Sequence, residues 1–196
     1  DRAPDHRVTS LRVIRYWDQA GSEDGDESAG GLIIKDGDRI ILADLVVGKW
    51  TWETRNDIIE STMEQDLLQF PNVELWIETQ FANKENQTIL WRRFQKFKVR
   101  FHQPTKNKVE RARGLSSAFE CGVVSFVKGD WTRRAIDQFL SFPPKKAGVA
   151  QDDIVDCFTG GYNRFIMTDE DSGDLPESWV PSVSARPYRS SARSVF

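Results

Sequence analysis

Strict alternation of side chains over residues 11–20 constrains the fold of this chain more than any other feature. Branched and aromatic residues alternate along it, so that Tyr16 and Trp17 fall on opposite sides. This pattern predicts a β-strand. The strand ends at Asp18, next to a polar stretch that contains glycine. A single aspartate in such a place is usually a turn residue, so its meaning depends on what later segments bring beside it.

Two further apolar runs extend this strand into an antiparallel meander. Residues 31–35 and 39–47 are joined by Asp36-Gly37-Asp38, and an Asp-Gly turn between apolar runs is a strong signal for a β-hairpin. Residues 19–30 carry acids, glycines and serines with few apolar side chains, which predicts a loop. We therefore expect three consecutive antiparallel strands near the start of the chain.

A helix and then another strand follow the meander. Over residues 51–69 apolar residues recur at helical spacing, and a Phe-Pro pair ends the run. Residues 73–78 again have the pattern of a strand, which ends at Glu78. A helix between two strands usually makes a right-handed crossover to a parallel neighbour. If that neighbour is the first strand, Asp18 and Glu78 lie together at the carboxyl end of the sheet, where open α/β folds build their sites.

The remainder of the chain alternates helices and short strands. Helices are expected over residues 84–97, 107–120, 130–142 and 152–165, and strands over residues 98–102 and 123–127. Asp130 is expected to cap the third of these helices. The whole pattern predicts an α/β fold in which a central mixed sheet is flanked by helices. We expect one domain over residues 1–167 and a polar, flexible tail over residues 168–196.

Composition argues against several classes of protein. No apolar run approaches the roughly 20 residues that a membrane helix needs, and no signal peptide opens the chain. The two cysteines, Cys121 and Cys157, have no metal-like spacing and favour a reducing compartment. The phosphate-loop pattern GxxxxGK followed by Ser or Thr is absent, which argues against ATP hydrolysis within these residues.

The net charge of −3 hides a strong asymmetry. Residues 18–30 contain five acids and no base, whereas residues 84–113 contain ten bases and two acids. This distribution predicts an acidic pocket beside a basic surface. A third acidic segment, residues 151–158, places Asp153 and Asp156 three residues apart on one face of an expected helix. Acids in a first helical turn also complement the helix dipole, so this pattern alone leaves both interpretations open.

Carboxylates that converge on one point repel each other unless cations neutralise them. Hard oxygen ligands select Mg²⁺ or Mn²⁺ rather than zinc. Two such ions about 4 Å apart would activate a water and stabilise the leaving oxygen in phosphodiester cleavage. The basic stretch would then hold the phosphates of a nucleic acid. Acids and bases together favour a metal-dependent nuclease.

A series of blocks resembles the nuclease domain of the large terminase subunit of tailed double-stranded DNA bacteriophages. Two of them are the strands Arg-Tyr-Trp-Asp-Gln-Ala and Trp-Ile-Glu, which end near Asp18 and at Glu78. The others are Lys108-Val109-Glu110-Arg111-Ala112, Gly122-Val123, Trp131, Ser141-Phe142-Pro143 and Asp152-Asp153-Ile154-Val155-Asp156. The resemblance spans residues 11–165, and its ordered series is much more specific than any single motif.

This resemblance implies an RNase H-like fold that cuts double-stranded concatemeric viral DNA with Mg²⁺ or Mn²⁺ during genome packaging. Matched to the family's motifs, the catalytic and metal-binding acids are Asp18, Glu78 and Asp153, with Asp156 as a fourth ligand. Asp18 and Glu78 would hold one ion, and Asp18 with Asp153 the other. No side-chain general base is needed, because a metal-bound water is already acidic enough.

Two positions depart from the family's pattern. Gln151 stands where the family often has His, and Cys157 replaces the usual Ala. Neither change removes a carboxylate. The family's N-terminal ATPase motor has no counterpart in these residues, so the chain is expected to cut DNA without translocating it. The implied partners are double-stranded DNA, the terminase small subunit and the portal, and the implied location is the cytoplasm of the bacterial host.

Further expectations concern the basic segment and the aromatic residues. DNA contacts are expected from Arg92, Arg93, Lys96, Lys98, Arg100, Lys106 and Lys108. Arg111 is expected instead to hold a structural carboxylate. His102 has no partner that the sequence identifies. The tryptophans Trp17, Trp76 and Trp131 are expected in the core.

Two other functions stay open at this point. Another RNase H-like nuclease, such as a junction resolvase or a transposase core, would use the same acids on branched DNA or in strand transfer. A non-catalytic docking module could bind DNA or a portal through the basic face. Such a module would gain nothing from clustered acids that repel each other.

Overall fold

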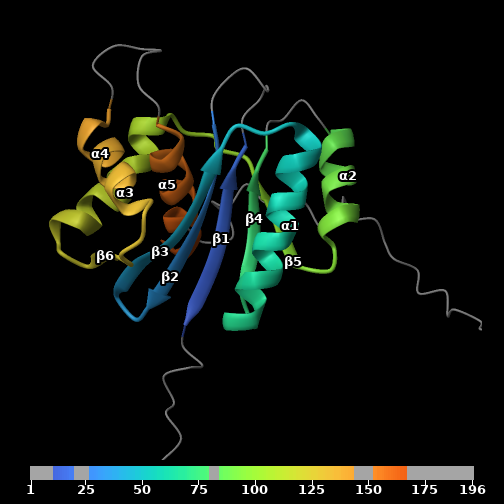
Figure 1. Cartoon of the computed structure of the whole chain (residues 1–196). Helices are drawn as coiled ribbons and strands as arrows, with labels where there is room; N and C mark the ends of the chain where they lie inside the picture. Colours follow the sequence, from blue (N-terminus) through green and yellow to red (C-terminus); the bar gives the residue numbers. More distant parts are fainter. Residues whose placement is uncertain (1–10, 20–26, 80–83, 144–151, 167–196) are drawn as a thin grey trace, which may run out of the picture.

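A six-stranded mixed sheet forms the centre of the computed structural model, which describes residues 11–19, 27–79, 84–143 and 152–166 (Figure 1). The strand order is β5-β4-β1-β2-β3-β6. The strands are β1 (Arg12–Asp18), β2 (Ser28–Asp36), β3 (Arg39–Gly48), β4 (Glu74–Glu78), β5 (Lys98–His102) and β6 (Val124–Phe126). The helices are α1 (Trp52–Gln69), α2 (Lys84–Phe94), α3 (Lys108–Glu120), α4 (Thr132–Ser141) and α5 (Asp153–Ile166). The predicted α/β fold with a mixed sheet and flanking helices is confirmed.

The predicted antiparallel meander is present in β1, β2 and β3. Gly37 sits in the β2–β3 turn with a φ of 58°, a left-handed conformation that favours glycine. The prediction that residues 19–30 form a loop was wrong for the last residues of this segment, because β2 already begins at Ser28. Gly30 pairs with Trp17, and a Cβ on Gly30 would lie 2.4 Å from the indole ring. The small residues that made this segment look like a loop therefore leave room for a buried tryptophan.

The predicted crossover is also confirmed. Helix α1 begins after Thr51, whose hydroxyl oxygen accepts a hydrogen bond from the Thr54 N–H at 3.2 Å. The chain then enters β4, which runs parallel to β1. Helix α2 leads in the same way to β5, parallel to β4. As a result, β1, β4 and β5 all point their carboxyl ends to one edge of the sheet.

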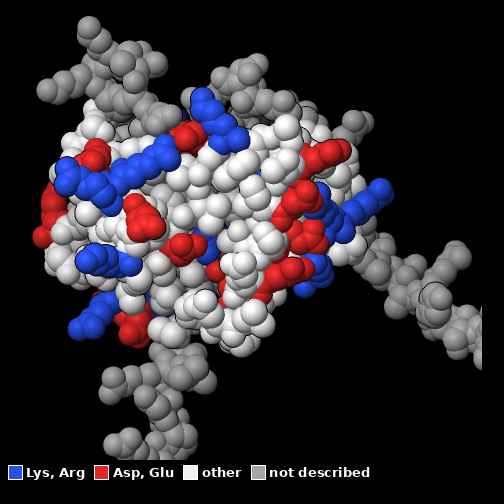
Figure 2. Space-filling view, in the orientation of Figure 1, with Lys and Arg blue, Asp and Glu red and all other residues white. Residues whose placement is uncertain are grey.

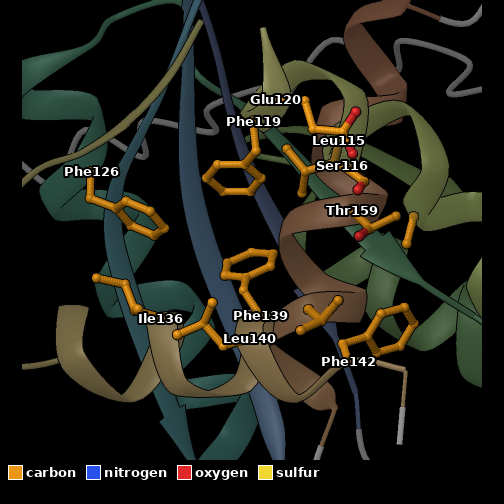
Figure 3. Close-up of a pocket in the computed structure, with 12 residues that line it drawn as sticks. Leu115, Ser116, Phe119, Glu120, Phe126, Ile136, Phe139, Leu140, Phe142 and Thr159 are labelled. Carbon is orange, nitrogen blue, oxygen red and sulfur yellow. The ribbon is translucent and has the colours of Figure 1, made fainter. Parts of the chain in front are cut away.

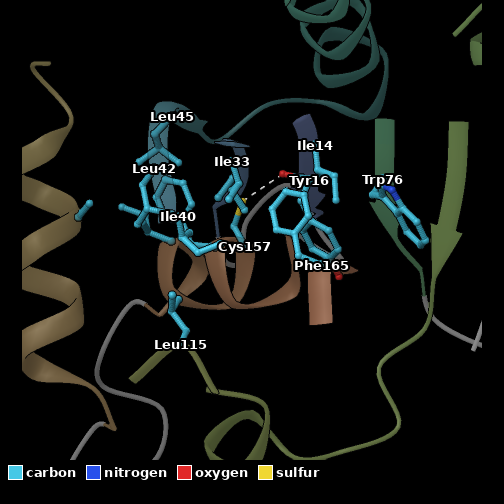
Figure 4. Close-up of a cluster of buried hydrophobic side chains, with 14 residues drawn as sticks. Ile14, Tyr16, Ile33, Ile40, Leu42, Leu45, Trp76, Leu115, Cys157 and Phe165 are labelled. Carbon is cyan, nitrogen blue, oxygen red and sulfur yellow. Dashed lines mark hydrogen bonds between the residues drawn. The ribbon is translucent and has the colours of Figure 1, made fainter. Parts of the chain in front are cut away.

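The two faces of the sheet are covered by different helices. Val13 and Trp17 of β1 pack in a cluster with residues of α1 and α2. Ile14 and Tyr16 pack in a second cluster with residues of α3, α4 and α5 (Figure 4). The alternation predicted for the first strand is therefore real, although both of its sides are buried. None of the helices in the described ranges is both long and apolar enough to span a membrane.

The start of α4 differs from the prediction. Trp131, not Asp130, occupies the N-cap position, and it makes no side-chain cap hydrogen bond. The Thr132 hydroxyl closes the preceding turn instead, because it accepts from the Gly129 N–H at 2.8 Å and donates to the Val127 carbonyl at 3.1 Å. The predicted role of Asp130 as a cap was therefore wrong.

Candidate metal centre

Two neighbouring strand ends place two carboxylates at the same edge of the sheet. Asp18 is the last residue of β1 and Glu78 is the last residue of β4. These strands are parallel, and their register runs as far as the pair Trp17 and Ile77. Asp18 and Glu78 are the next residues along, and alternation puts both on the face that α5 covers. The sequence argument for this juxtaposition depended on the crossover, which the structure contains.

The first turns of α5 bring two more carboxylates to this edge. Asp153 and Asp156 are both buried, with exposed fractions of 6% and 3%. The helix is held against β1 by the Cys157 thiol, which donates to the Tyr16 carbonyl at 3.1 Å (Figure 4). The chain position that departs from the family's usual Ala thus anchors the helix that carries these acids.

The four carboxylates act on each other electrostatically. Burial raises the pKa of Asp18 well above its ordinary value, and the negative charges of Glu78, Asp156 and Asp153 raise it further, against the opposing charge of Arg111. Burial also raises the pKa of Glu78 and of Asp156, although cationic neighbours oppose both shifts. The group therefore holds more negative charge than its surroundings compensate.

Two basic residues of α3 stand among these acids. Arg111 lies between Glu78 and Asp156, with N–O distances of 3.3 and 3.1 Å. Lys108 contacts Asp156 at 2.7 Å and Asp152 at 2.8 Å. Lysine and arginine three residues apart lie on one face of a helix, so α3 presents both to the site. The expectation that Arg111 holds a structural carboxylate agrees with this geometry, and it holds two.

The acids fit a hard divalent cation by their chemistry, since the donors are carboxylate oxygens that carry an excess of negative charge. Among the residues that the structure describes, however, no three Asp, Glu, His or Cys side chains are grouped closely enough to hold an ion as they stand. Both oxygens of Asp156 are taken by cations, Oδ1 by Arg111 and Oδ2 by Lys108. Basic side chains of α3 therefore pair with both oxygens of Asp156, whereas Asp18 lies among other acids.

Two residues that the sequence did not identify as part of the site support Glu78. The Tyr16 hydroxyl lies 2.8 Å from Oε2 of Glu78 and 2.6 Å from Nδ1 of His102. An ionised carboxylate can only accept, so Tyr16 donates to Glu78 and the Nδ1–H of His102 donates to the Tyr16 oxygen. Burial, with the charges of Arg164 and Arg111, lowers the pKa of His102 to about 3, so the ring is neutral at physiological pH.

The sequence contains signals that could have identified Tyr16 and His102 as neighbours of Glu78. His102 is the register partner of Glu78 across the β4–β5 pair, which could have been inferred once β5 was placed beside β4. Gly160 and Gly161 are consecutive in α5, where glycine is unfavourable. A Cβ on Gly160 would lie 2.3 Å from the Tyr16 ring, so this glycine allows the helix to approach the tyrosine closely.

Most of the basic residues expected to contact DNA pair with acids outside the site, whereas Lys108 pairs with Asp152 and Asp156. Arg93 and Lys96 pair with acids of α1, and Lys98 and Arg100 pair with Glu74. Lys106 lies 4.0 Å from Glu110. Figure 2 shows blue and red side chains next to each other over this face of the molecule. Within the described ranges the basic segment is therefore largely compensated by acids, and its contact with DNA stays a prediction.

Other predicted residues have simpler outcomes. Trp17 and Trp76 are buried, as expected, with exposed fractions of 0% and 5%. Trp131 packs half-buried against the cluster that contains Trp76, also as expected. Gln151 and the tail over residues 168–196 lie outside the described residues.

A search of curated protein sequences finds no match. A family model described as "Terminase RNaseH-like domain" matches residues 15–164.

Among solved structures, the human cytomegalovirus terminase nuclease domain, soaked with Mn and bound to an inhibitor, is similar at a TM-score of 0.58 and 14% identity, covering 82% of this chain and 83% of that one. The large terminase nuclease from thermophilic phage G20c with bound magnesium has a TM-score of 0.57 and 17% identity, covering 81% and 82%. The large terminase of a second thermophilic bacteriophage has a TM-score of 0.58 and 11% identity, covering 80% of this chain and 40% of that one. At these identities the likeness establishes the fold.

Proposed function

Because the chain belongs to the family of terminase RNase H-like domains, we propose that it is a metal-dependent endonuclease that cleaves double-stranded concatemeric viral DNA during genome packaging. One observation carries this proposal. Four carboxylates from β1, β4 and α5 converge at the carboxyl edge of the sheet, with more negative charge than their surroundings compensate. A fold with no catalytic use for these acids would gain nothing from burying them together.

The proposed ligands are Asp18, Glu78 and Asp153, with Asp156 as a fourth. Asp18 and Glu78 would hold one ion, and Asp18 with Asp153 would hold the other. Similar solved structures contain manganese, magnesium or zinc, which supports a divalent ion here, and the carboxylate donors favour Mg²⁺ or Mn²⁺. When bound, the two ions supply an activated water and stabilise the leaving oxygen of the phosphodiester bond.

The chain's own residues orient these acids. Tyr16 and Arg111 both bond Oε2 of Glu78, so Oε1 is the oxygen that would be available to a cation. His102 in turn forms a hydrogen bond with the Tyr16 hydroxyl. Arg111 and Lys108 fix both oxygens of Asp156, so this acid binds an ion only if one of these cations moves away. This difference makes Asp156 the weaker ligand of the set.

The partners and the domain limits belong to the same proposal. Double-stranded DNA is the substrate, and in the full assembly the terminase small subunit and the portal are partners, in the cytoplasm of the bacterial host. Residues 1–167 form the nuclease domain. DNA binding by the basic segment requires either residues outside its ion pairs or exchange of acids for phosphates, as counterion release allows.

Cleavage of a supercoiled plasmid tests the function. The purified chain is incubated with Mn²⁺, Mg²⁺ or EDTA, alongside Asp18→Asn and the control Asp137→Asn, which changes an exposed acid of α4. We expect nicking and linearisation that need metal, are lost in Asp18→Asn and persist in Asp137→Asn. Intact plasmid under every condition, with DNA binding retained, would instead support a docking module. Cleavage by Asp18→Asn at the wild-type rate would show that the site is elsewhere.

A further inference from the structure

Helix α5 carries two of the proposed ligands, Asp153 and Asp156, in its first turns. The first N–H groups of a helix have no partner within the helix, so the direction of the first turn depends on what accepts from them. Helix ends also fray readily. The position of Asp153 therefore depends on the contacts at the start of α5.

One such contact comes from α4. Oε1 of Gln138 accepts a hydrogen bond from the Ile154 N–H at 3.1 Å, and both residues are buried. This N–H belongs to the peptide group that joins Asp153 to Ile154, and a peptide group is planar. The hydrogen bond therefore fixes the backbone from which the Asp153 carboxylate projects.

The same face of α4 also contacts the chain beside Asp18. Arg134 lies four residues before Gln138, which puts both residues on one face of the helix. The Arg134 guanidinium pairs with Glu27, the residue before β2. Strand β2 in turn pairs with β1 as far as Asp18. Helix α4 thus links the strand that flanks Asp18 to the helix that carries Asp153.

Apolar packing between α4 and α5 is incomplete, which gives the hydrogen bond more weight. A cavity of about 460 Å³ opens between α3, α4 and α5, and its walls include Phe139 of α4 and Val155 and Thr159 of α5 (Figure 3). Side chains on a cavity wall forfeit dispersion contacts on that side. Phe139 stacks on Phe158 further along α5, with 6.2 Å between the ring centroids. The first turn of α5 therefore depends on Gln138 more than its middle does.

Two other contacts of α5 act further along the helix. Three residues after Ile154, the Cys157 thiol donates to the Tyr16 carbonyl. The Asn163 side-chain amide donates to the Arg111 carbonyl at 3.2 Å. Both contacts fix the body of α5 rather than its first turn.

We propose that Gln138 is a positioning residue of the metal centre, which holds the Asp153 carboxylate beside Asp18 so that the two can share an ion. The inference rests on the proposed function, in which Asp18 and Asp153 would hold one ion and Asp18 and Glu78 the other. Gln138 acts through the peptide group of Ile154 rather than by contact with an ion. Its loss therefore weakens one of the two ions.

Calorimetric titration of the full chain with Mn²⁺ tests this. Gln138→Met keeps the length of the side chain but removes the acceptor. We expect it to weaken one of two Mn²⁺ binding steps about 10- to 100-fold, as for other partners behind a metal ligand, and to leave the other step unchanged. Gln138→Glu keeps an oxygen acceptor and should restore the weakened step, whereas an added charge acting by itself would strengthen both steps.

A variant of the same helix separates positioning from stability. Ile136→Ala removes apolar contacts of α4 at the cavity wall without touching the hydrogen bond to Ile154. It should lower the melting temperature in EDTA while both Mn²⁺ binding steps stay as in the wild type. Exchange of the Ile154 amide proton, followed by NMR, should be faster in Gln138→Met than in the wild type or in Ile136→Ala, which verifies the loss of the hydrogen bond.

Two results would overturn the inference and leave the proposed function intact. Wild-type affinity in both binding steps of Gln138→Met, with fast exchange of the Ile154 amide, would show that the hydrogen bond does not position Asp153. Equal weakening of both steps in Gln138→Met and in Ile136→Ala would show that the hydrogen bond only stabilises the fold. If the wild type itself binds no Mn²⁺, the proposed metal centre is wrong and this inference is wrong with it.

Discussion

The two sides of strand β1 bury charge in opposite ways. On the face covered by α1, the guanidinium of Arg15 is 1% exposed and bonds both oxygens of Asp66 at 2.7 and 2.8 Å. It also donates to Asp44 and to the Gly30 carbonyl. On the face covered by α5, three residues further along the strand, Asp18 lies among other acids. One strand thus carries a compensated cluster and an uncompensated one.

The pKa shifts reflect this difference. Burial alone would lower the pKa of Arg15, but its ion pairs with Asp66 and Asp44 raise it overall, so the cluster favours its charged state. Burial raises the pKa of Asp18, and neighbouring acids raise it further, so the folded protein disfavours the charged state there. The Arg15 cluster, which stabilises the fold, pairs its buried charges with one another. The proposed metal centre keeps an excess of negative charge that a bound cation would neutralise, as expected where function competes with stability.

The largest effect should come from breaking the compensated cluster. Arg15→Met leaves Asp66 buried without its partner, and removal of one member of a buried ion pair costs about 3–5 kcal/mol. Urea unfolding measures the loss. Arg133→Met is the matched control, because Arg133 is 87% exposed and pairs, among the described residues, only with Asp137. Such a pair is worth about 1 kcal/mol or less. Equal effects in the two variants would refute the distinction.

Removing one charge from the uncompensated cluster should have the opposite sign. In EDTA at neutral pH, Asp18→Asn should be more stable than the wild type, because its folded state no longer holds an ionised carboxylate with a raised pKa. A rise in melting temperature of about 2–4 °C corresponds to 1 kcal/mol in a domain of this size.

The pH dependence follows from the sign of the same shift. A raised carboxyl pKa destabilises the folded state above the unfolded pKa, so the wild type should gain stability relative to Asp18→Asn as the pH falls from neutral. Added Mn²⁺ should stabilise the wild type more than the variant. A variant less stable than the wild type in EDTA would show that Asp18 is compensated after all.

Removing the support behind Glu78 should give a smaller effect. Tyr16→Phe deletes the hydroxyl that bonds Glu78 and His102, and loss of such an outer partner typically lowers metal affinity or activity about 10- to 100-fold. Titration calorimetry with Mn²⁺ measures the affinity, and plasmid cleavage the activity. Tyr162→Phe, which removes a half-buried hydroxyl of α5 outside these hydrogen bonds, is the control. If both variants bind Mn²⁺ like the wild type, the hydroxyl plays no part in orienting Glu78.

The smallest effect concerns the basic segment. Arg92 is exposed and makes no ion pair within the described residues, whereas Lys96 pairs with Glu60 and Glu64. If Arg92 contacts a phosphate, Arg92→Ala should lower the slope of log K against log salt by up to about 0.9, and Lys96→Ala should change it less. DNA binding measured over a salt series tests this, and identical slopes for both variants and the wild type would remove Arg92 from the interface.

The sequence by itself determined much of the frame. The alternation over residues 11–20, the Asp-Gly hairpin and the helix that crosses to Glu78 are local patterns, and local periodicity is what a single sequence records directly. These patterns predicted that Asp18 and Glu78 would end adjacent parallel strands if the crossover strand lies beside the first, and the structure supplied that pairing. The order of the blocks also indicated the family, since matching blocks need no knowledge of packing.

Only the tertiary structure decided which charges meet. Arg15 finds Asp66 across 51 residues of sequence, and His102 reaches Tyr16 across 86. The same is true of Gly30, whose lack of a side chain signals a loop until the indole that occupies its space is known. Such pairings depend on which faces come together when helices pack on a sheet. That information lies in the packing of distant segments. A charged or polar group needs a protein partner only once it has left water, and the packing decides which groups leave water.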